Sequence, residues 1–253
     1  MKTIKKYTHK ERMEIAKQMV SVAKQRFGKN LEAVAVRGST ARKTDGPYSD
    51  LEMFAFIKKM PTDQKHKSYG KDRRIIDGLL IELIWVTKEN YIKEVKEISG
   101  AWFGSGADKL LSLLNPSLVR KLNSFKPTNA KQKCLDQAAL LWDHLQESAT
   151  KSINAAEAKN KDAMAMVLHD TFSNILKMVA FFNAKPYTTF SKLVEESRKM
   201  KYRPADLESL TKLVVGGKYG RFSEIKKLLF SVLSEFEELL LKKGYKLDHD
   251  DFE

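Results

Sequence analysis

The stretch AVAVRGSTARKTDGPYSDLEMFAFI, residues 33–57, decides how the first half of the chain folds. Two apolar runs flank a middle rich in Gly, Pro, Ser and Asp, a pattern typical of two strands joined by turns. Asp50 and Glu52 begin the second run. Side chains two residues apart on a strand leave the same face, so both carboxylates share one face while Leu51 and Met53 take the other.

Two ionised carboxylates side by side repel each other unless a cation lies between them. Mg²⁺ is the cation that oxygen ligands of this kind favour. A third acid, Glu82, stands alone within the apolar run LLIELIW. If its strand pairs beside the strand of Glu52, the three carboxylates Asp50, Glu52 and Glu82 form a metal site.

Gly38 and Ser39 follow the first strand directly. Glycine lets a backbone approach a ligand closely, and a serine hydroxyl with the next amides can hold phosphate oxygens. Arg42 and Lys43 add positive charge for a triphosphate. Each feature alone is commonly a turn or a solvated strand edge, but their joint order predicts displacement at a nucleotide phosphorus.

The rest of the first half predicts an α+β domain with a small mixed sheet. A helix begins after the capping box of Thr8 and Glu11 and extends to about Phe27. Apolar runs bounded by turn residues predict strands at 31–39, 50–59 and 78–88. Further helices are expected at 90–99, 106–114 and 115–123.

Strand signals nearly vanish after residue 126. Apolar residues at three- and four-residue spacing predict a helical bundle instead. The expected helices are 130–160, 162–183, 189–200, 204–216 and 222–244. The sequence therefore predicts two domains, 1–126 and 127–253.

Composition narrows the class of protein. Of 253 residues, 42% are hydrophobic, enough for two cores, and the single cysteine, Cys134, suits a reducing cytosol. We see no signal peptide and no apolar run of membrane-spanning length, so a cytoplasmic protein without a membrane partner is expected.

The net charge is +14, and residues 1–125 carry 25 Lys and Arg against 14 Asp and Glu. Such an excess attracts anions, including nucleotides and nucleic acid. A solvated lysine-rich surface explains the same charge equally well.

The segment GSTARKTDGPYSDLEM, residues 38–53, resembles the signature of the kanamycin nucleotidyltransferase family, of the aminoglycoside 4'-adenylyltransferase type. That family belongs to the polymerase-β-like nucleotidyltransferases, marked by Gly-Ser followed by Asp-x-Asp or Asp-x-Glu. The resemblance implies a nucleotidyltransferase domain, a helical C-terminal domain and a homodimer. It also implies a Mg²⁺-dependent transfer of AMP from ATP to an aminoglycoside hydroxyl, with release of pyrophosphate and a role in antibiotic resistance.

The resemblance assigns roles to residues of the motif. Those implied to bind the nucleotide are Gly38, Ser39, Arg42 and Ser49, and those implied at the metal are Asp50, Glu52 and Glu82. In the matching segment DHLQESATKSIN, residues 143–154, Glu147 becomes the general base and Lys151 a phosphate ligand. Apart from the resemblance, we expect Asp143, Glu147 and Glu82, together with Glu52, to form a local acidic pocket that binds a cationic acceptor. Spacing alone also fits an ordinary row of exposed ion pairs on one helical face.

The chain departs from the family between the second and third predicted strands. Family members carry acids there, whereas residues 61–78 hold five basic residues: Lys65, Lys67, Lys71, Arg73 and Arg74. The acceptor therefore stays open between an aminoglycoside and a hydroxyl of RNA or protein docked on the basic half. A non-catalytic nucleotide-binding relative is a third alternative, which the retained Asp50, Glu52 and Glu82 disfavour.

Overall fold

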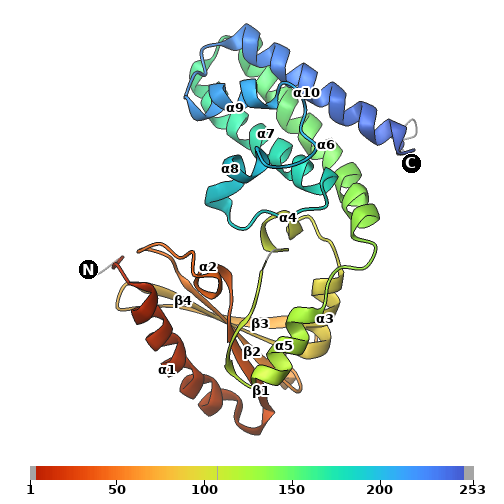
Figure 1. Cartoon of the computed structure of the whole chain (residues 1–253). Coiled ribbons are helices and arrows are strands. Elements are labelled where there is room, and N and C mark those ends of the chain that lie inside the picture. The colour runs from red at the N-terminus through yellow and green to blue at the C-terminus, as the bar shows by residue number, and fades with distance from the viewer. Residues whose placement is uncertain (1–3, 107, 248–253) are drawn as a thin grey trace. The chain divides into compact units, whose positions relative to one another are not determined.

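The computed structural model describes residues 4–106 and 108–247. The chain divides by its internal contacts into two compact units (Figure 1). The first comprises Met1–Glu97 with Asp108–Thr128, and the second Ile98–Ala107 with Asn129–Glu253. A mixed sheet with helices forms the first and helices form the second, so the α+β class is confirmed. The domain limits at residue 126 stay a prediction, and residues 98–107 cluster with the second unit although they precede the last strand of the first.

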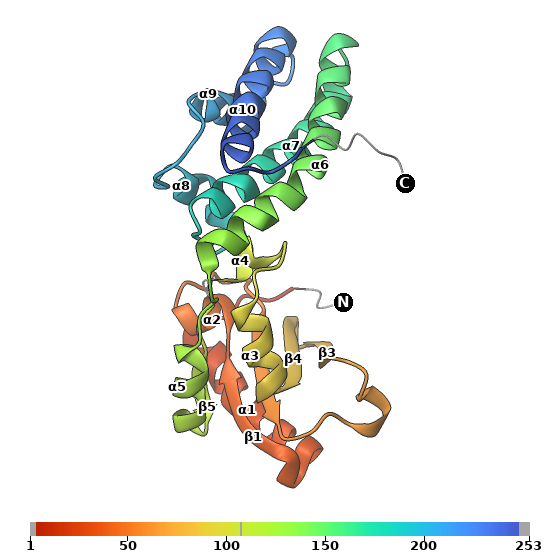
Figure 2. The same cartoon turned by 90° about the vertical axis from the view of Figure 1, so that its right-hand side faces the viewer.

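A five-stranded sheet in the order β3-β4-β2-β1-β5 is the centre of the first unit. Only the β2–β4 pair is parallel among its neighbouring strands. Figure 2 shows β3 at the outer edge beside β4. The strands are β1 (Leu31–Val36), β2 (Leu51–Ile57), β3 (Tyr69–Ile76), β4 (Leu79–Thr87) and β5 (Leu111–Leu114).

Helices cover both faces of this sheet (Figure 1). Alternate residues of β1, β2 and β4 pack against α1 on one face, and the intervening residues pack against α3 and α5 on the other. Short helices fill the connections. The helical elements are α1 (His9–Phe27), η1 (Gly28–Asn30), α2 (Gly38–Arg42), η2 (Thr62–Gln64), α3 (Lys88–Lys96) and α5 (Pro116–Ser124).

The prediction of a helix at 106–114 is wrong. Residues 108–110 are not helical, and Leu111–Leu114 form β5, which pairs antiparallel with β1. A four-residue leucine-rich run carries no clear period, so the open edge of β1 decided its conformation. Strand β3 was likewise not expected, because its charged residues suit an exposed sheet edge rather than a core strand.

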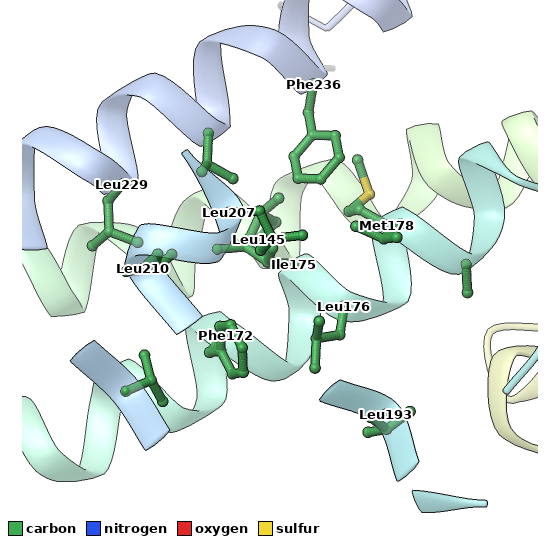
Figure 3. Packing of buried hydrophobic residues seen from close by; sticks show 14 of the residues in the cluster. Leu145, Phe172, Ile175, Leu176, Met178, Leu193, Leu207, Leu210, Leu229 and Phe236 are labelled. Carbon is green, nitrogen blue, oxygen red and sulfur yellow. The ribbon is translucent and has the colours of Figure 1, made fainter. Parts of the chain in front are cut away.

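The second unit is a helical bundle, as predicted. Its core joins leucine, isoleucine and phenylalanine side chains from several helices (Figure 3). The helix expected at 189–200 is shorter than predicted and divides into η3 and α8. The elements are α4 (Trp102–Ser105), α6 (Ala130–Glu157), α7 (Lys161–Phe182), η3 (Phe190–Lys192), α8 (Leu193–Ser197), α9 (Leu207–Val215) and α10 (Phe222–Lys242). Within the described residues, no helix is both long and apolar enough to cross a bilayer.

Arg12 of α1 is a completely buried cation. It pairs with Asp45, whose side chain is 1% exposed. Its Nε donates to the carbonyl of Ser49 at 3.1 Å, and its Nη2 donates to the carbonyls of Gly46 at 3.1 Å and Tyr7 at 3.3 Å. This one guanidinium therefore fixes the loop from α2 to β2, the segment that ends at Asp50.

Replacing Arg12 with Met should lower the free energy of unfolding by about 3 kcal/mol, because Asp45 would stay buried without its guanidinium partner. His9 Nδ1, which lies 2.8 Å from Asp45 Oδ1, would remain beside it. Urea denaturation followed by circular dichroism measures the change. Lys17→Met, which breaks an exposed pair with Glu14, is the matched control. Equal denaturation midpoints for the two variants would contradict this role of Arg12.

Candidate active site

The parallel pairing of β2 with β4 aligns two of the predicted acids. Glu52 and Glu82 are direct partners in the register. Both lie on the sheet face that packs against α3 and α5, because their neighbours Phe54 and Ile84 belong to that core. The expected pairing of these two strands is confirmed.

Gly38 lies directly against Glu52. Its φ is +66°, a conformation that residues with a side chain rarely adopt, and a Cβ placed there would overlap Glu52 Oε2. The positive φ is what favours glycine at this position, and the contact shows how closely the Glu52 carboxylate approaches the backbone. The backbone at the start of α2 and the carboxylate of β2 consequently form one compact group.

Burial raises the pKa of the Glu52 carboxyl above its ordinary value. The guanidinium of Arg37 opposes this shift, whereas the carboxylates of Asp50, Asp108 and Glu82 add to it. A carboxylate that is half-buried among other carboxylates gains stability from a cation. Asp50 and Glu52 therefore fit a divalent ion on the chemistry of the donor set.

Among the described residues, no group of three or more His, Cys, Asp or Glu side chains is arranged to hold a metal. Mg²⁺ is commonly bound through one or two protein carboxylates together with substrate phosphates, so a two-carboxylate site is sufficient. The metal ligands Asp50, Glu52 and Glu82 stay a prediction.

Glu82 differs from Glu52 because its carboxylate forms direct salt bridges within the sheet. Its carboxylate is nearly buried and pairs with Lys71 Nζ at 2.8 Å and Arg73 Nη2 at 2.9 Å, both from β3. All these contacts use Oε2. A metal or an acceptor amine would therefore have to use Oε1 or displace a basic side chain.

Three residues beyond the motif's acids shape the surroundings of Glu52. Asp108 accepts from Arg37 Nη2 and Arg42 Nη1, both at 2.5 Å. Arg37 also stacks over Phe54, with 5.2 Å from its guanidinium carbon to the ring centre. The Nε atoms of Arg37 and Arg42 are buried and have no hydrogen-bond partner within the described residues. These free donors are compatible with an anionic ligand beside Arg42.

The two predicted phosphate-binding serines occupy different surroundings. Ser39 lies in α2, directly after Gly38. The hydroxyl of Ser49 accepts from the backbone N–H of Gly46 at 3.0 Å and so stabilises the turn before Asp50. Sequence reasoning did not identify Arg37 or Asp108 because no local pattern connects residues so far apart in the chain.

The remaining predicted residues lie on α6 of the second unit. Glu147 and Lys151 form an exposed pair, with 2.7 Å between Oε1 and Nζ. The hydrogen bond from Lys151 lowers the pKa of Glu147. Both residues line a pocket of about 280 Å³ between α6 and α7, whereas Asp143 is outside its lining.

Three polar residues of α7 complete this pocket: Asp170, Asn174 and Lys177. Their spacing of four and three places them on one face of the helix. This spacing is visible in the sequence, but apolar residues at the same spacing in this segment predicted only the packing of a bundle helix.

Comparison with known proteins adds to this geometry. The family model of the KNTase C-terminal domain matches residues 119–246. An aminoglycoside nucleotidyltransferase (4') of a Bacillus species is 21% identical over 245 residues, covering 95% of this chain and 94% of that protein. A protein of the same description from Staphylococcus aureus is 20% identical with the same coverage. A solved nucleotidyltransferase-like protein from Exiguobacterium sibiricum 255-15 is 13% identical and has a TM-score of 0.45. The match covers 91% of this chain and 75% of that protein.

The KNTase domain match and the two aminoglycoside nucleotidyltransferases define this chain, with its mixed sheet and the Gly38–Glu52 contact, as a nucleotidyltransferase. The chain belongs to the KNTase family, whose C-terminal domain model covers half of it.

Glu52→Gln should raise the melting temperature at neutral pH in the absence of divalent ions. The raised pKa means that folding disfavours the ionised form, so the charge destabilises the native state at pH values above that pKa. The gain should begin to shrink as the pH falls through the raised pKa and should disappear below the ordinary value of 4.5, where Glu52 is protonated in both the folded and the unfolded state.

Scanning calorimetry across pH measures this difference, with Glu89→Gln, whose side chain is 66% exposed, as the control. A Glu52→Gln variant that melts below the wild type at neutral pH would show that Arg37 fully compensates the charge.

Proposed function

We propose that this enzyme transfers AMP from Mg-ATP to a hydroxyl group of a small molecule and releases pyrophosphate. The acceptor class is an aminoglycoside, as the descriptions of both relatives indicate. Modification of such a compound would confer antibiotic resistance. We place the reaction in the cytoplasm, in agreement with the buried free thiol of Cys134. A homodimer is part of this proposal.

The contact of Gly38 with Glu52, beside Asp50, is the observation that carries the proposal. Asp50 and Glu52 would hold Mg²⁺, and Glu82 would contribute Oε1 as a further protein oxygen, beside the substrate phosphates. The ion would neutralise charge on the phosphate under attack. The backbone of Gly38 and the side chains of Ser39, Arg42 and Ser49 would orient the triphosphate.

Glu147 is the proposed general base. Its lowered pKa keeps the carboxylate ionised at neutral pH, so it can accept the proton of the attacking hydroxyl. Lys151 would bind a phosphate oxygen. When it does, the bond that lowers the pKa of Glu147 is lost and the carboxylate becomes a stronger base. Asp143 and Glu82 would bind acceptor amines.

A second acceptor class is favoured by one observation. Lys71 and Arg73 of β3 are 39% and 58% exposed and already neutralise Glu82. Positive charge at this edge suits the phosphates of RNA or an acidic protein surface better than a polycation. Nucleotidyl transfer to a macromolecular hydroxyl is therefore the alternative to test.

Asp50→Asn should abolish transfer while the fold is retained, because one metal ligand is lost. The assay incubates the enzyme with Mg-ATP and a panel of aminoglycosides and records pyrophosphate release. Asp63→Asn, in the exposed η2, is the matched control. Near-normal turnover by Asp50→Asn would contradict the metal assignment.

The same assay decides the acceptor. Parallel reactions contain total RNA or protein and ATP labelled at the α-phosphate. Release of pyrophosphate with an aminoglycoside supports the proposal. Labelling of RNA or protein, without any release in the aminoglycoside panel, would replace it with the second class.

Glu147→Gln should lower kcat by at least about 100-fold, since general base catalysis contributes on that order. The KM for ATP should change little. Glu238→Gln, which breaks a similar exposed pair with Lys242, is the control. An equal loss of ATP binding and of turnover would assign Glu147 to structure or nucleotide binding rather than to proton transfer.

A further inference from the structure

A buried polar network fixes α6 against α7 at the turn that carries Glu147 (Figure 1 shows the two helices). The hydroxyl of Thr171 donates to the carbonyl of Ser148 at 2.8 Å and lies 2.8 Å from the hydroxyl of Ser152. Asn174 Nδ2 donates to Ser148 Oγ at 3.2 Å. These four residues are buried. Polar groups inside a helical bundle that satisfy one another set a single register between the helices.

Asn174 uses its amide nitrogen in this network, so its amide oxygen can accept a hydrogen bond from Lys177. Lys177 Nζ donates to Asn174 Oδ1 at 2.9 Å and lies 5.5 Å from the ring centre of Phe103. Both contacts are with neutral groups. Within the described part of the chain, no carboxylate lies within 4.0 Å of this ammonium group. Lys177 is thus a half-buried cation, held in place but without a counter-charge.

Lys151, in the same pocket, has the opposite surroundings. It pairs with Glu147, and Asp170 further raises its pKa. The acids of the pocket therefore act on Lys151, and the ammonium of Lys177 keeps N–H donors for a ligand. A lysine that is partly desolvated and lacks an anionic partner gains free energy when an anion binds.

We propose that the α6–α7 pocket is a phosphate-binding subsite in which Lys177 binds the phosphate oxygens. The pocket of about 280 Å³ has room for a phosphate group beside Lys177. The Asn174–Ser148 pair holds Lys177 in position, and Lys177 contacts the ligand as a point charge.

The identity of the anion rests on the proposed function. That reaction supplies phosphate groups from the ATP donor or pyrophosphate, and a phosphorylated acceptor is the other source. The chemistry at Lys177 is the same in both cases, so kinetics with each substrate must separate them.

Isothermal titration with inorganic pyrophosphate, without divalent ions, tests the subsite on the full-length protein. Lys177→Met should weaken binding by at least about tenfold, as expected when a hydrogen-bonded charge is removed. Lys177→Arg should retain most of the affinity. Lys161→Met, an exposed lysine outside the pocket on the same helix, should bind like the wild type.

Asn174→Asp provides a second variant that keeps the lysine. It places a carboxylate beside Lys177 and should weaken pyrophosphate binding as Lys177→Met does, with the melting temperature as the check on folding. Unchanged affinity in both variants, or absence of pyrophosphate binding by the wild type, would overturn the subsite.

Steady-state kinetics separate the sources and the two proposals. A higher KM for ATP alone in Lys177→Met indicates the donor phosphate, and a higher KM for the acceptor indicates an acceptor phosphate; either supports the subsite. Transfer that proceeds with unchanged KM values and unchanged pyrophosphate affinity would refute the subsite and leave the proposed function intact. Lys177-dependent pyrophosphate binding without transfer to any acceptor would refute the proposed function and leave the subsite intact.

Discussion

The buried ion pair of Arg12 with Asp45 is the interaction on which the first unit depends. It joins α1 to the loop between α2 and β2 through a charge pair and backbone carbonyls. A guanidinium can satisfy so many acceptors because its donors lie in one rigid plane. The loop therefore enters β2 in a fixed position, and Asp50 and Glu52 follow in a defined register beside Gly38.

The same region contains an ion pair that stabilises the fold and a carboxylate that favours a bound cation. Arg12 and Asp45 neutralise each other in the interior. The carboxylates of Asp50, Asp108 and Glu82 raise the pKa of Glu52, and the guanidinium of Arg37 opposes them. Such an arrangement disfavours the ionised state of Glu52 and makes a bound cation favourable. Strained or charged positions that lower stability are typical of functional sites.

Basic residues balance the acids in both units, but not in the same way. Lys71 and Arg73 neutralise Glu82 at the edge of the sheet. In the helical unit, Lys151 has Glu147 and Asp170, whereas Lys177, among the described residues, contacts the amide of Asn174 and the ring of Phe103 without an ion pair. The unbalanced members, Glu52 and Lys177, are therefore the positions where a cation and an anion gain most from binding.

The sequence by itself determined the α+β and helical halves, the strand that follows Asp50 and carries Glu52, and the glycine after β1. These follow from local period and turn chemistry, which neighbouring residues supply. It did not determine β3 or β5, because short or charged segments become strands only when an open sheet edge supplies hydrogen-bond partners. Tertiary structure alone brought Asp108 to Arg37 and Arg42, Lys71 to Glu82, and Asn174 to Ser148. Pairs separated by many residues leave no local pattern, so only the packed fold decides which charges meet.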